Sequence, residues 1–486
     1  MSLLDISAIL LTLAAIFGYL NHRLLKLPNS IGIMLIGLLV SLGMILLGQK
    51  FEGFTAIATR FVSQIDFNET LMKGMLSYLL FAGALHVNLS DLKMQRRLVA
   101  ILATAGVLLS TCLIGFISYY VFQWCGLDIP LPWCFVFGSL ISPTDPVAVL
   151  GILRKAGVPK SLETKITGES LFNDGVGVVI YLVLLSYAIG SGSGQAELDL
   201  AEVGTFFLQE AGGGILLGAI AGGLCFYLLR SIDNYQVELL ITLALVTGGY
   251  SLASYWHLSG PLAMVVAGLM IGNHGRRLAM SDVTRQHVDL FWELIDEVLN
   301  ALLFLLIGLE IFIIAWTDES LMAGGILIIV TLLCRFTAIS IPVAVLQKFR
   351  SFTPGVTCIL TWGGLRGGIS VALALAIPRE GVPDGVRDGI LVATYVIVIF
   401  SIAVQGLTLR PLVSRILAKG QLSDEDRGVD SVIVSGGDLE VAGEAGSGEA
   451  PAATGAVAGT SLEGEVKEAP SATGAPDEDP ARKDGV

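Results

Sequence analysis

Long apolar runs separated by short polar segments fill residues 1–420 of the 486-residue chain. About 20 apolar residues make one membrane-spanning helix, and a window of about 19 residues locates such helices in a sequence. The runs predict an all-α polytopic membrane protein with about thirteen transmembrane helices, of which the ninth is short. Their expected ranges are 3–21, 31–49, 70–88, 98–122, 132–153, 165–189, 203–229, 236–256, 260–273, 298–316, 322–347, 355–378 and 388–417.

Two of these spans are interrupted in their middles. Residues 142–146, in the fifth span, read Ser-Pro-Thr-Asp-Pro, and residues 362–368, in the twelfth, read Trp-Gly-Gly-Leu-Arg-Gly-Gly. Proline removes a backbone donor and disfavours helix just before it, and glycine weakens a helix. Irregular backbone at membrane depth must line a cavity or be covered by protein.

The two interruptions hold equivalent positions if spans 1–6 and spans 8–13 are two six-helix repeats. Because the offset of seven spans is odd, such repeats are inverted in the membrane. Paired interruptions in two halves indicate the midplane binding site of a secondary transporter. The alternative interpretation is two unrelated proline and glycine kinks.

The composition agrees with a membrane protein. Apolar residues make up 54% of the chain and charged residues 15%, against about 25% charged residues in soluble domains. The six cysteines lack the paired spacing of metal ligands, so neither a zinc site nor a disulfide framework is indicated. Without a phosphate-binding loop, an ATP-driven pump is disfavoured. We expect no cofactor.

The net charge of −13 is concentrated at the C-terminal end. Residues 421–486 carry 15 acidic and 4 basic residues, whereas residues 1–420 carry 27 acidic and 25 basic ones. The balanced body argues against a basic face for nucleic acid. Gly, Ala, Ser, Glu and Asp dominate the end segment, which cannot bury enough apolar surface to fold. We therefore predict a transmembrane domain over 1–420 and a disordered, acidic cytoplasmic tail over 421–486.

The distribution of Lys and Arg between loops predicts the orientation in the membrane. Eighteen of them fall in the loops after odd-numbered spans or after span 13, when Lys165, Arg410 and Arg415 at the adjoining span ends are included, and four fall on the other side. Basic residues near span ends stay in the cytoplasm. The N-terminus is expected outside and the C-terminus inside.

Span 6 carries two carboxylates in an apolar helix, where residues 168–175 read Gly-Glu-Ser-Leu-Phe-Asn-Asp-Gly. A charge at the bilayer centre costs roughly 2.5–3.5 kcal/mol, so such residues are functional candidates that need partners. We expect Glu169 to form a structural ion pair with Arg366 of the interrupted twelfth span. A second buried pair is predicted between Glu310 and Arg335, on adjacent antiparallel spans.

The second acid of span 6 is expected to face the cavity. Helical spacing places Ser170 and Asp174 on one face, and we expect Asp145 and Thr144 of the fifth span around them. Ligands that are all oxygen suit a hard cation, and sodium is the cation that we predict there. A buried carboxylate must be neutralised, so Asp174 would bind either a proton or a cation. The alternative is that Asp174 or Asp145 only caps a helix end.

Together, the motifs at 142–146, 168–175 and 362–368 resemble those of the cation:proton antiporter-1 family, the sodium/proton exchangers of the NhaP and NHE type. The likeness covers roughly residues 1–418. It implies a thirteen-helix homodimer in the cell membrane, with a core domain that moves like an elevator against a dimerisation domain. It also implies exchange of sodium or lithium for protons, and no enzymatic activity.

The resemblance makes Asp174 the ion- and proton-binding carboxylate and adds its neighbour Asn173 to the ion site. It likewise implies that Thr144, Asp145 and Ser170 belong to the ion site and that Glu169 and Arg366 form the structural ion pair. The Asn-Asp pair is similar to the electroneutral branch of the family, which exchanges one cation for one proton. Some archaeal members carry a glutamate ligand in span 3, where this chain has Ala82. Loss of that ligand is expected to weaken cation binding.

Three other functions remain as alternatives. Exchange of potassium for protons would use the same site. A cation channel could be lined by the same broken helices, although channels usually build filters from rings of identical groups. A membrane-embedded enzyme could use Asp145 and Asp174 as paired acids, but no nucleophile or metal triad accompanies them.

Overall fold

The structure is a computed structural model and is helical throughout its described part. It describes residues 3–48, 75–145, 160–192, 208–310, 316–346, 354–379 and 381–418, together with the short pieces 149, 153, 158 and 204–205. The predicted tail, residues 421–486, lies outside the described residues.

The helices follow the order of the predicted spans, and several of them continue into a five-residue π-helical turn, labelled η. In chain order they are α1 (Leu3–Leu20), η1 (Asn21–Leu25), α2 (Asn29–Gly48), α5 (Leu76–Leu85), α6 (Leu89–Ile101), η3 (Leu102–Gly106), α7 (Val107–Trp124), α8 (Leu131–Ile141), α10 (Lys160–Gly192), η4 (Leu208–Gly212), α12 (Gly213–Arg230), α13 (Tyr235–Tyr255), α14 (Gly260–Met270), η5 (Ile271–Gly275), α15 (Arg276–Leu278), α16 (Asp282–Glu310), α17 (Asp318–Leu346), α18 (Pro354–Trp362), α19 (Gly368–Leu375), α20 (Val386–Phe400), η6 (Ser401–Gln405) and α21 (Gly406–Ala418).

The apolar runs predicted these helices well. Each of the thirteen expected ranges contains a helix in its described part. Seven helical segments there are long and apolar enough to cross a membrane, and the apolar parts of α2, α5 and α8 are shorter. The chain is therefore an all-α polytopic membrane protein, as predicted.

The start of α16 is the clearest difference from the prediction. We expected the tenth span to begin at residue 298, but the helix begins at Asp282. Its first half mixes acidic residues with apolar ones at helical spacing, which a hydropathy window averages away. Val288 and Trp292 lie on the buried side of this half, and the Trp292 indole donates to Thr242 Oγ1 of α13 at 3.2 Å.

Polar side chains fix where several helices begin. The Asn88 side chain accepts from the backbone N–H of Ser90 at the start of α6. The Asn234 side chain accepts from two backbone N–H groups at the start of α13. Ser259 caps α14, which has a proline in its first turn. Such caps satisfy donors that a helix N-terminus leaves unpaired.

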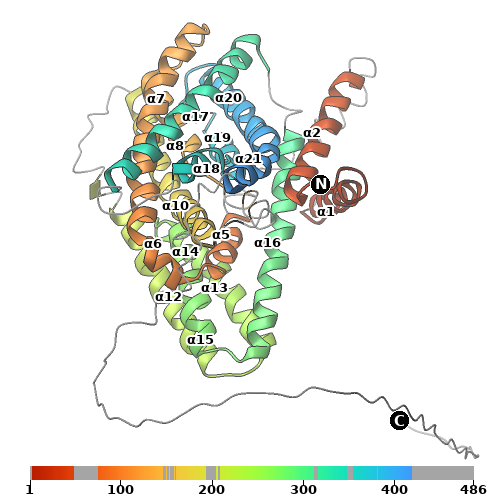
Figure 1. The fold of residues 1–486 in the computed structure, drawn as a ribbon, viewed down its shortest axis with the longest axis vertical. Coiled ribbons are helices and arrows are strands. Elements are labelled where there is room, and N and C mark those ends of the chain that lie inside the picture. The colour runs from red at the N-terminus through yellow and green to blue at the C-terminus, as the bar shows by residue number, and fades with distance from the viewer. Residues whose placement is uncertain are drawn as a thin grey trace, which may run out of the picture. The chain divides into compact units, whose positions relative to one another are not determined.

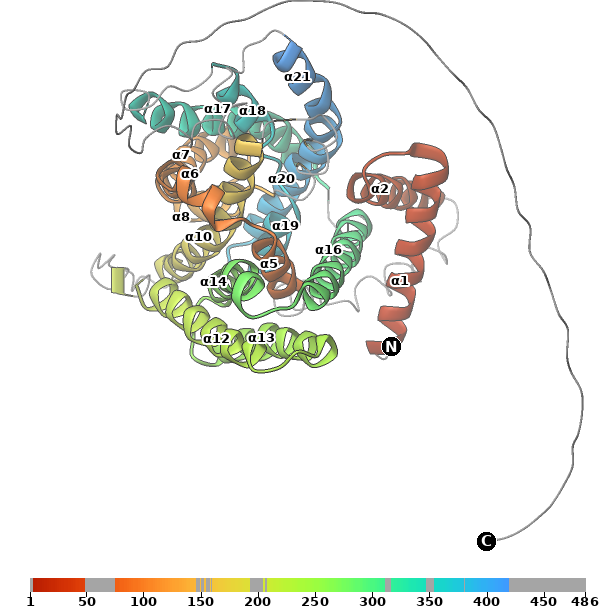
Figure 2. The same cartoon turned by 60° about the horizontal axis from the view of Figure 1, so that its bottom comes forward.

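The helices pack around the two interrupted spans. The helices α8 and α10 are in contact, as are α17 and α20, and the interrupted α18–α19 segment touches both groups (Figure 1). In Figure 2, α1 and α2 lie beside α16, and α12 and α13 lie beside α14. A large apolar cluster joins α8, α10, α17 and α20.

Glycines allow the closest helix contacts. Gly214 and Gly218 of α12 face α14: a Cβ at Gly214 would lie 2.5 Å from the Ser259 carbonyl oxygen, and one at Gly218 would lie 2.3 Å from that of Ala263. These glycines therefore serve packing within the chain.

Candidate functional site

The interruption after α8 is capped by an arginine from the other interrupted span. The helix ends at Ile141, before Pro143. Arg366 Nη1 donates to the carbonyl of Ser142 and, at 2.7 Å, to that of Pro143. The Arg366 backbone N–H donates to Ser401 Oγ at 2.9 Å. A cation suits a helix C-terminus, where carbonyls lack partners and the helix dipole is negative.

The two interruptions also meet through their backbones. The backbone N–H of Asp145 donates to the carbonyl of Leu365 at 2.8 Å. Gln405 Nε2 donates to the carbonyl of Trp362, the last residue of α18, at 3.1 Å. Protein groups thus satisfy the unwound backbone, as a non-aqueous environment requires.

Three of the predicted site residues form one hydrogen-bond network beside the break. Asn173 Nδ2 donates to Thr144 Oγ1 at 2.8 Å, and the Thr144 backbone N–H donates to Asn173 Oδ1 at 3.3 Å. The hydroxyl groups of Thr144 and Ser170 are 3.0 Å apart. All three side chains are buried. The network fastens α10 to the unwound end of α8.

Asp174 lies one residue further along α10 and is 5% exposed. In the part of the chain that the structure describes, no hydrogen bond or ion pair reaches its carboxylate. The negative charges of Asp145 and Asp174 act on each other, and Asp145 also acts on Asp296 of α16. A buried carboxylate without a protein counter-ion needs a proton or a cation.

Asp145 also lies at the start of a helix. Its carboxylate is packed against Gly367, the residue before α19, and a carboxylate is stabilised at a helix N-terminus. The helix-capping alternative from the sequence therefore has a geometric basis for Asp145. For Asp174, which lies inside α10, it has none.

The predicted ion pair of Glu169 is wrong in its partner. Glu169 pairs with Arg335 of α17, with Oε1 and Nη2 2.6 Å apart, and both side chains are buried. Arg366 lies near enough for its charge to act on Glu169, but its Nη1 is taken by the carbonyls of the α8 break. The sequence placed Arg335 with Glu310, whose side chain lies outside the described residues.

Nothing in the sequence distinguishes the two buried arginines. Both lie in apolar spans, and either could be the counter-ion for Glu169 on charge alone. Only the contact between the two breaks, which brings Arg366 to the carbonyls of Ser142 and Pro143, leaves Arg335 as the partner of Glu169. The expected site residues Asp145, Thr144, Ser170, Asn173 and Asp174 are brought to one region. The Glu310 side chain lies outside the described residues, and its predicted partner Arg335 pairs with Glu169.

Two glycines of the twelfth-span motif are required by close approach. A Cβ at Gly364 would lie 2.7 Å from Arg335 Nε, and one at Gly367 would lie 2.0 Å from Asp145 Oδ2. Both distances are far below van der Waals contact. The glycines on either side of Arg366 therefore admit the charged groups that surround it.

We expect Gly367→Ala to displace the Asp145 carboxylate and to reduce the cation–proton exchange predicted from the sequence at least tenfold, because misplacement of a binding group by about 1 Å has effects of that order or larger. Ala at Gly325 on α17, where nothing lies within 4 Å of a Cβ, is the matched control. Transport by both variants in proteoliposomes, at equal protein content, provides the measurement. Equal rates would show that Asp145 need not hold this position.

Ala82, where some relatives have an acidic ligand, is fully buried in α5. It belongs to an apolar cluster with Phe81 and Trp292. The surroundings thus match an apolar side chain at this position.

The described helices define a membrane protein built around two interrupted spans whose breaks contact each other. The sequence matches the family described as "Sodium/hydrogen exchanger, transmembrane" over residues 10–415. The chain belongs to this sodium/hydrogen exchanger family.

Individual relatives agree with this assignment. The Na⁺/H⁺ antiporter NhaP of Pseudomonas aeruginosa is 47% identical over 433 residues, which cover 88% of this chain and all of that protein. The Na⁺/H⁺ antiporter NhaH of Halobacillus dabanensis is 35% identical, over 81% of this chain and 93% of that protein. The structure of the sodium proton antiporter MjNhaP1 of Methanocaldococcus jannaschii covers 86% of this chain and all of its own, with a TM-score of 0.68 at 19% identity, so it shows the same fold.

Proposed function

We propose that this protein is a secondary antiporter that exchanges sodium for protons across the cell membrane. The observation that carries the proposal is the buried Asp174 carboxylate, which has no counter-ion in the described part of the chain. Asp174 follows Asn173, whose amide bonds Thr144 in the break after α8. The similarity to the Na⁺/H⁺ antiporters NhaP and NhaH supports the choice of ions.

Competition at one carboxylate gives the exchange mechanism. When Asp174 is ionised, it binds sodium together with oxygen atoms of Asp145, Thr144 and Ser170, because a hard cation prefers oxygen ligands. When a proton neutralises Asp174, the electrostatic attraction for the cation is lost. Asn173 acts as a positioning residue, since its amide already bonds both the backbone and the hydroxyl of Thr144.

The same site suggests how transport is coupled. One titrating carboxylate carries either one sodium ion or one proton, so we propose an electroneutral exchange of one for one. Lithium is expected to share the site. We further propose that a homodimer carries out elevator-type alternating access, with the N-terminus outside and the C-terminus in the cytoplasm. The excess of basic residues in the loops after odd-numbered spans supports this orientation.

Everted membrane vesicles test the choice of cation. With an acidic interior imposed, addition of sodium or lithium outside is expected to raise the internal pH, and potassium is expected to do so much less. Clamping the membrane potential should leave the initial rate unchanged. Activity with potassium alone would reassign the cation within the same mechanism, whereas sodium flux without proton movement would favour the channel alternative.

The acidic tail is expected to be dispensable for transport. All five proposed ion-site residues precede residue 175, and the match to the exchanger family ends at residue 415. Truncation after residue 420 should therefore keep the initial exchange rate within about twofold of the full chain. Vesicles with matched protein content allow the comparison, and a loss of more than tenfold would place an essential element in the tail.

A further inference from the structure

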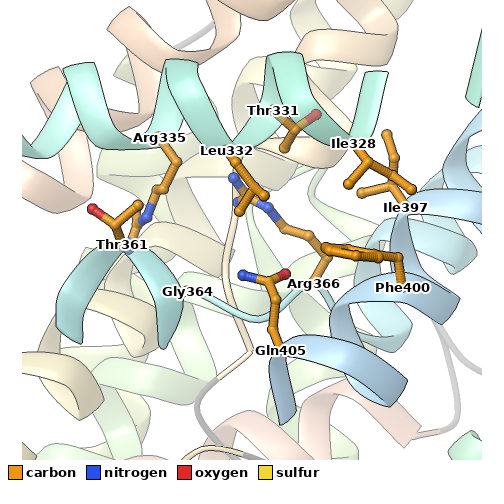
Figure 3. A pocket seen from close by; sticks show the side chains of 10 residues that line it. All are labelled: Ile328, Thr331, Leu332, Arg335, Thr361, Gly364, Arg366, Ile397, Phe400 and Gln405. Atoms are coloured by element: carbon orange, nitrogen blue, oxygen red, sulfur yellow. The ribbon is translucent and has the colours of Figure 1, made fainter. Parts of the chain in front are cut away.

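A small cavity lies between α17, the interruption at residues 363–367 and the α20–η6 segment (Figure 3). The cavity volume, counted as the space that the centre of a water molecule can occupy, is about 10 Å³. This is room for one water molecule or one small ion. The polar lining residues are Thr331, Arg335, Thr361, Arg366 and Gln405, and the rest of the wall consists of Gly364 and four apolar side chains from α17 and α20.

Three buried polar atoms of these lining residues have no hydrogen-bond partner: Arg335 Nε, Arg366 Nη2 and Thr331 Oγ1. The side chains of all three residues are at least nine-tenths buried. Leaving a buried donor unsatisfied costs about 1–3 kcal/mol, and more when the group is charged. Unpartnered donors on three residues that line one cavity indicate that a further group binds there.

The charge around the cavity selects the kind of ligand. Two guanidinium groups face one carboxylate, Glu169, which pairs with Arg335 through Nη2. Among the described residues, no carboxylate lines the cavity itself. The unpartnered guanidinium nitrogens can only donate hydrogen bonds. A ligand that accepts from both of them and carries one negative charge would satisfy the donors and balance the charge.

We propose that this cavity binds a single small monovalent anion of halide type. The anion accepts hydrogen bonds from Arg335 Nε, Arg366 Nη2 and the Thr331 hydroxyl, and so joins α17 to the interrupted twelfth span. Because Arg366 also caps the α8 break, anion binding stabilises the contact between the two interruptions. This site is separate from the proposed cation site, and its test does not depend on transport.

The test uses the purified full-length protein and bromide as the probe. Bromide replaces gluconate at constant sodium concentration and ionic strength, and the thermal unfolding temperature is followed. A ligand that binds the folded state raises this temperature, so we expect a saturable rise. Thr331→Val removes one donor while keeping the side-chain shape, and should raise the half-saturating bromide concentration about fivefold to tenfold.

Thr337→Val, on the same helix, is the matched control because the Thr337 hydroxyl already bonds the Leu333 carbonyl. It should leave the half-saturating concentration unchanged. Crystals grown in bromide should show an anomalous peak within hydrogen-bond distance of Arg335 Nε and Arg366 Nη2. A water molecule in the cavity predicts no peak, and either no effect of bromide or a linear effect equal in all three proteins. Those results would overturn the proposal.

Discussion

Asp174→Asn is expected to reduce sodium-driven proton movement to the level of vesicles without the protein. Asparagine keeps the shape of the side chain but neither titrates nor carries the charge that attracts sodium. Both halves of the exchange cycle are lost together. The protein should still fold, because a neutral amide is cheaper to bury than an isolated carboxylate.

The measurement is proton flux in proteoliposomes on adding sodium, with size-exclusion profiles and unfolding temperatures as checks on folding. Asp128→Asn is the matched control: Asp128 is exposed in the loop before α8, and its carboxylate accepts from Gln123. The same chemical change there should leave the flux unaltered. Sodium-dependent proton flux by Asp174→Asn above the empty-vesicle level would contradict the mechanism.

The second large effect concerns the Glu169–Arg335 pair. Glu169→Gln or Arg335→Met alone should lower the free energy of unfolding by about 3–5 kcal/mol, since each leaves a buried charge without its partner. The double variant should recover part of the loss, because neither charge remains. The coupling energy is the effect of the double variant minus the summed effects of the two single variants. Residues in contact show coupling energies of about 0.5–3 kcal/mol, and we expect a value at the upper end.

The control is the same set of two single variants and one double variant, with Arg366→Met in place of Arg335→Met. Arg366 donates to backbone carbonyls rather than to Glu169, so its coupling to Glu169→Gln should be smaller. Equilibrium unfolding in mixed detergent micelles measures all the variants. A larger coupling with Arg366 would restore the pair that the sequence first indicated.

The sequence predicted features that depend on local chemistry. Pro143 and the glycines around Arg366 cannot continue a regular helix, so both interruptions were visible as patterns. The segments 142–146 and 168–175 likewise contain every residue of the hydrogen-bond network between α8 and α10. Their equivalent positions in two repeats were enough to predict that both interruptions belong to one midplane site.

Features that depend on tertiary structure could not be predicted in this way. The partner of Glu169 is set by the contact between the break after α8 and the break before α19, which leaves Arg366 for the carbonyls and Arg335 for the carboxylate. The early start of α16 was missed because Trp292 and its neighbours are buried by α13 and α5, and a hydropathy window does not register such partners.

The contact between Arg366 and the α8 break has a consequence for biosynthesis. Ser142, whose carbonyl accepts, and Arg366, whose guanidinium donates, are separated by 224 residues. At a synthesis rate of about 5–20 residues per second, roughly 10–45 s pass between the two positions. During that time the first half of the protein is inserted with uncapped carbonyls in its fifth span. Its early folding must therefore proceed while water or the insertion machinery satisfies these groups. The carbonyls bond Arg366 only after the second half has been inserted.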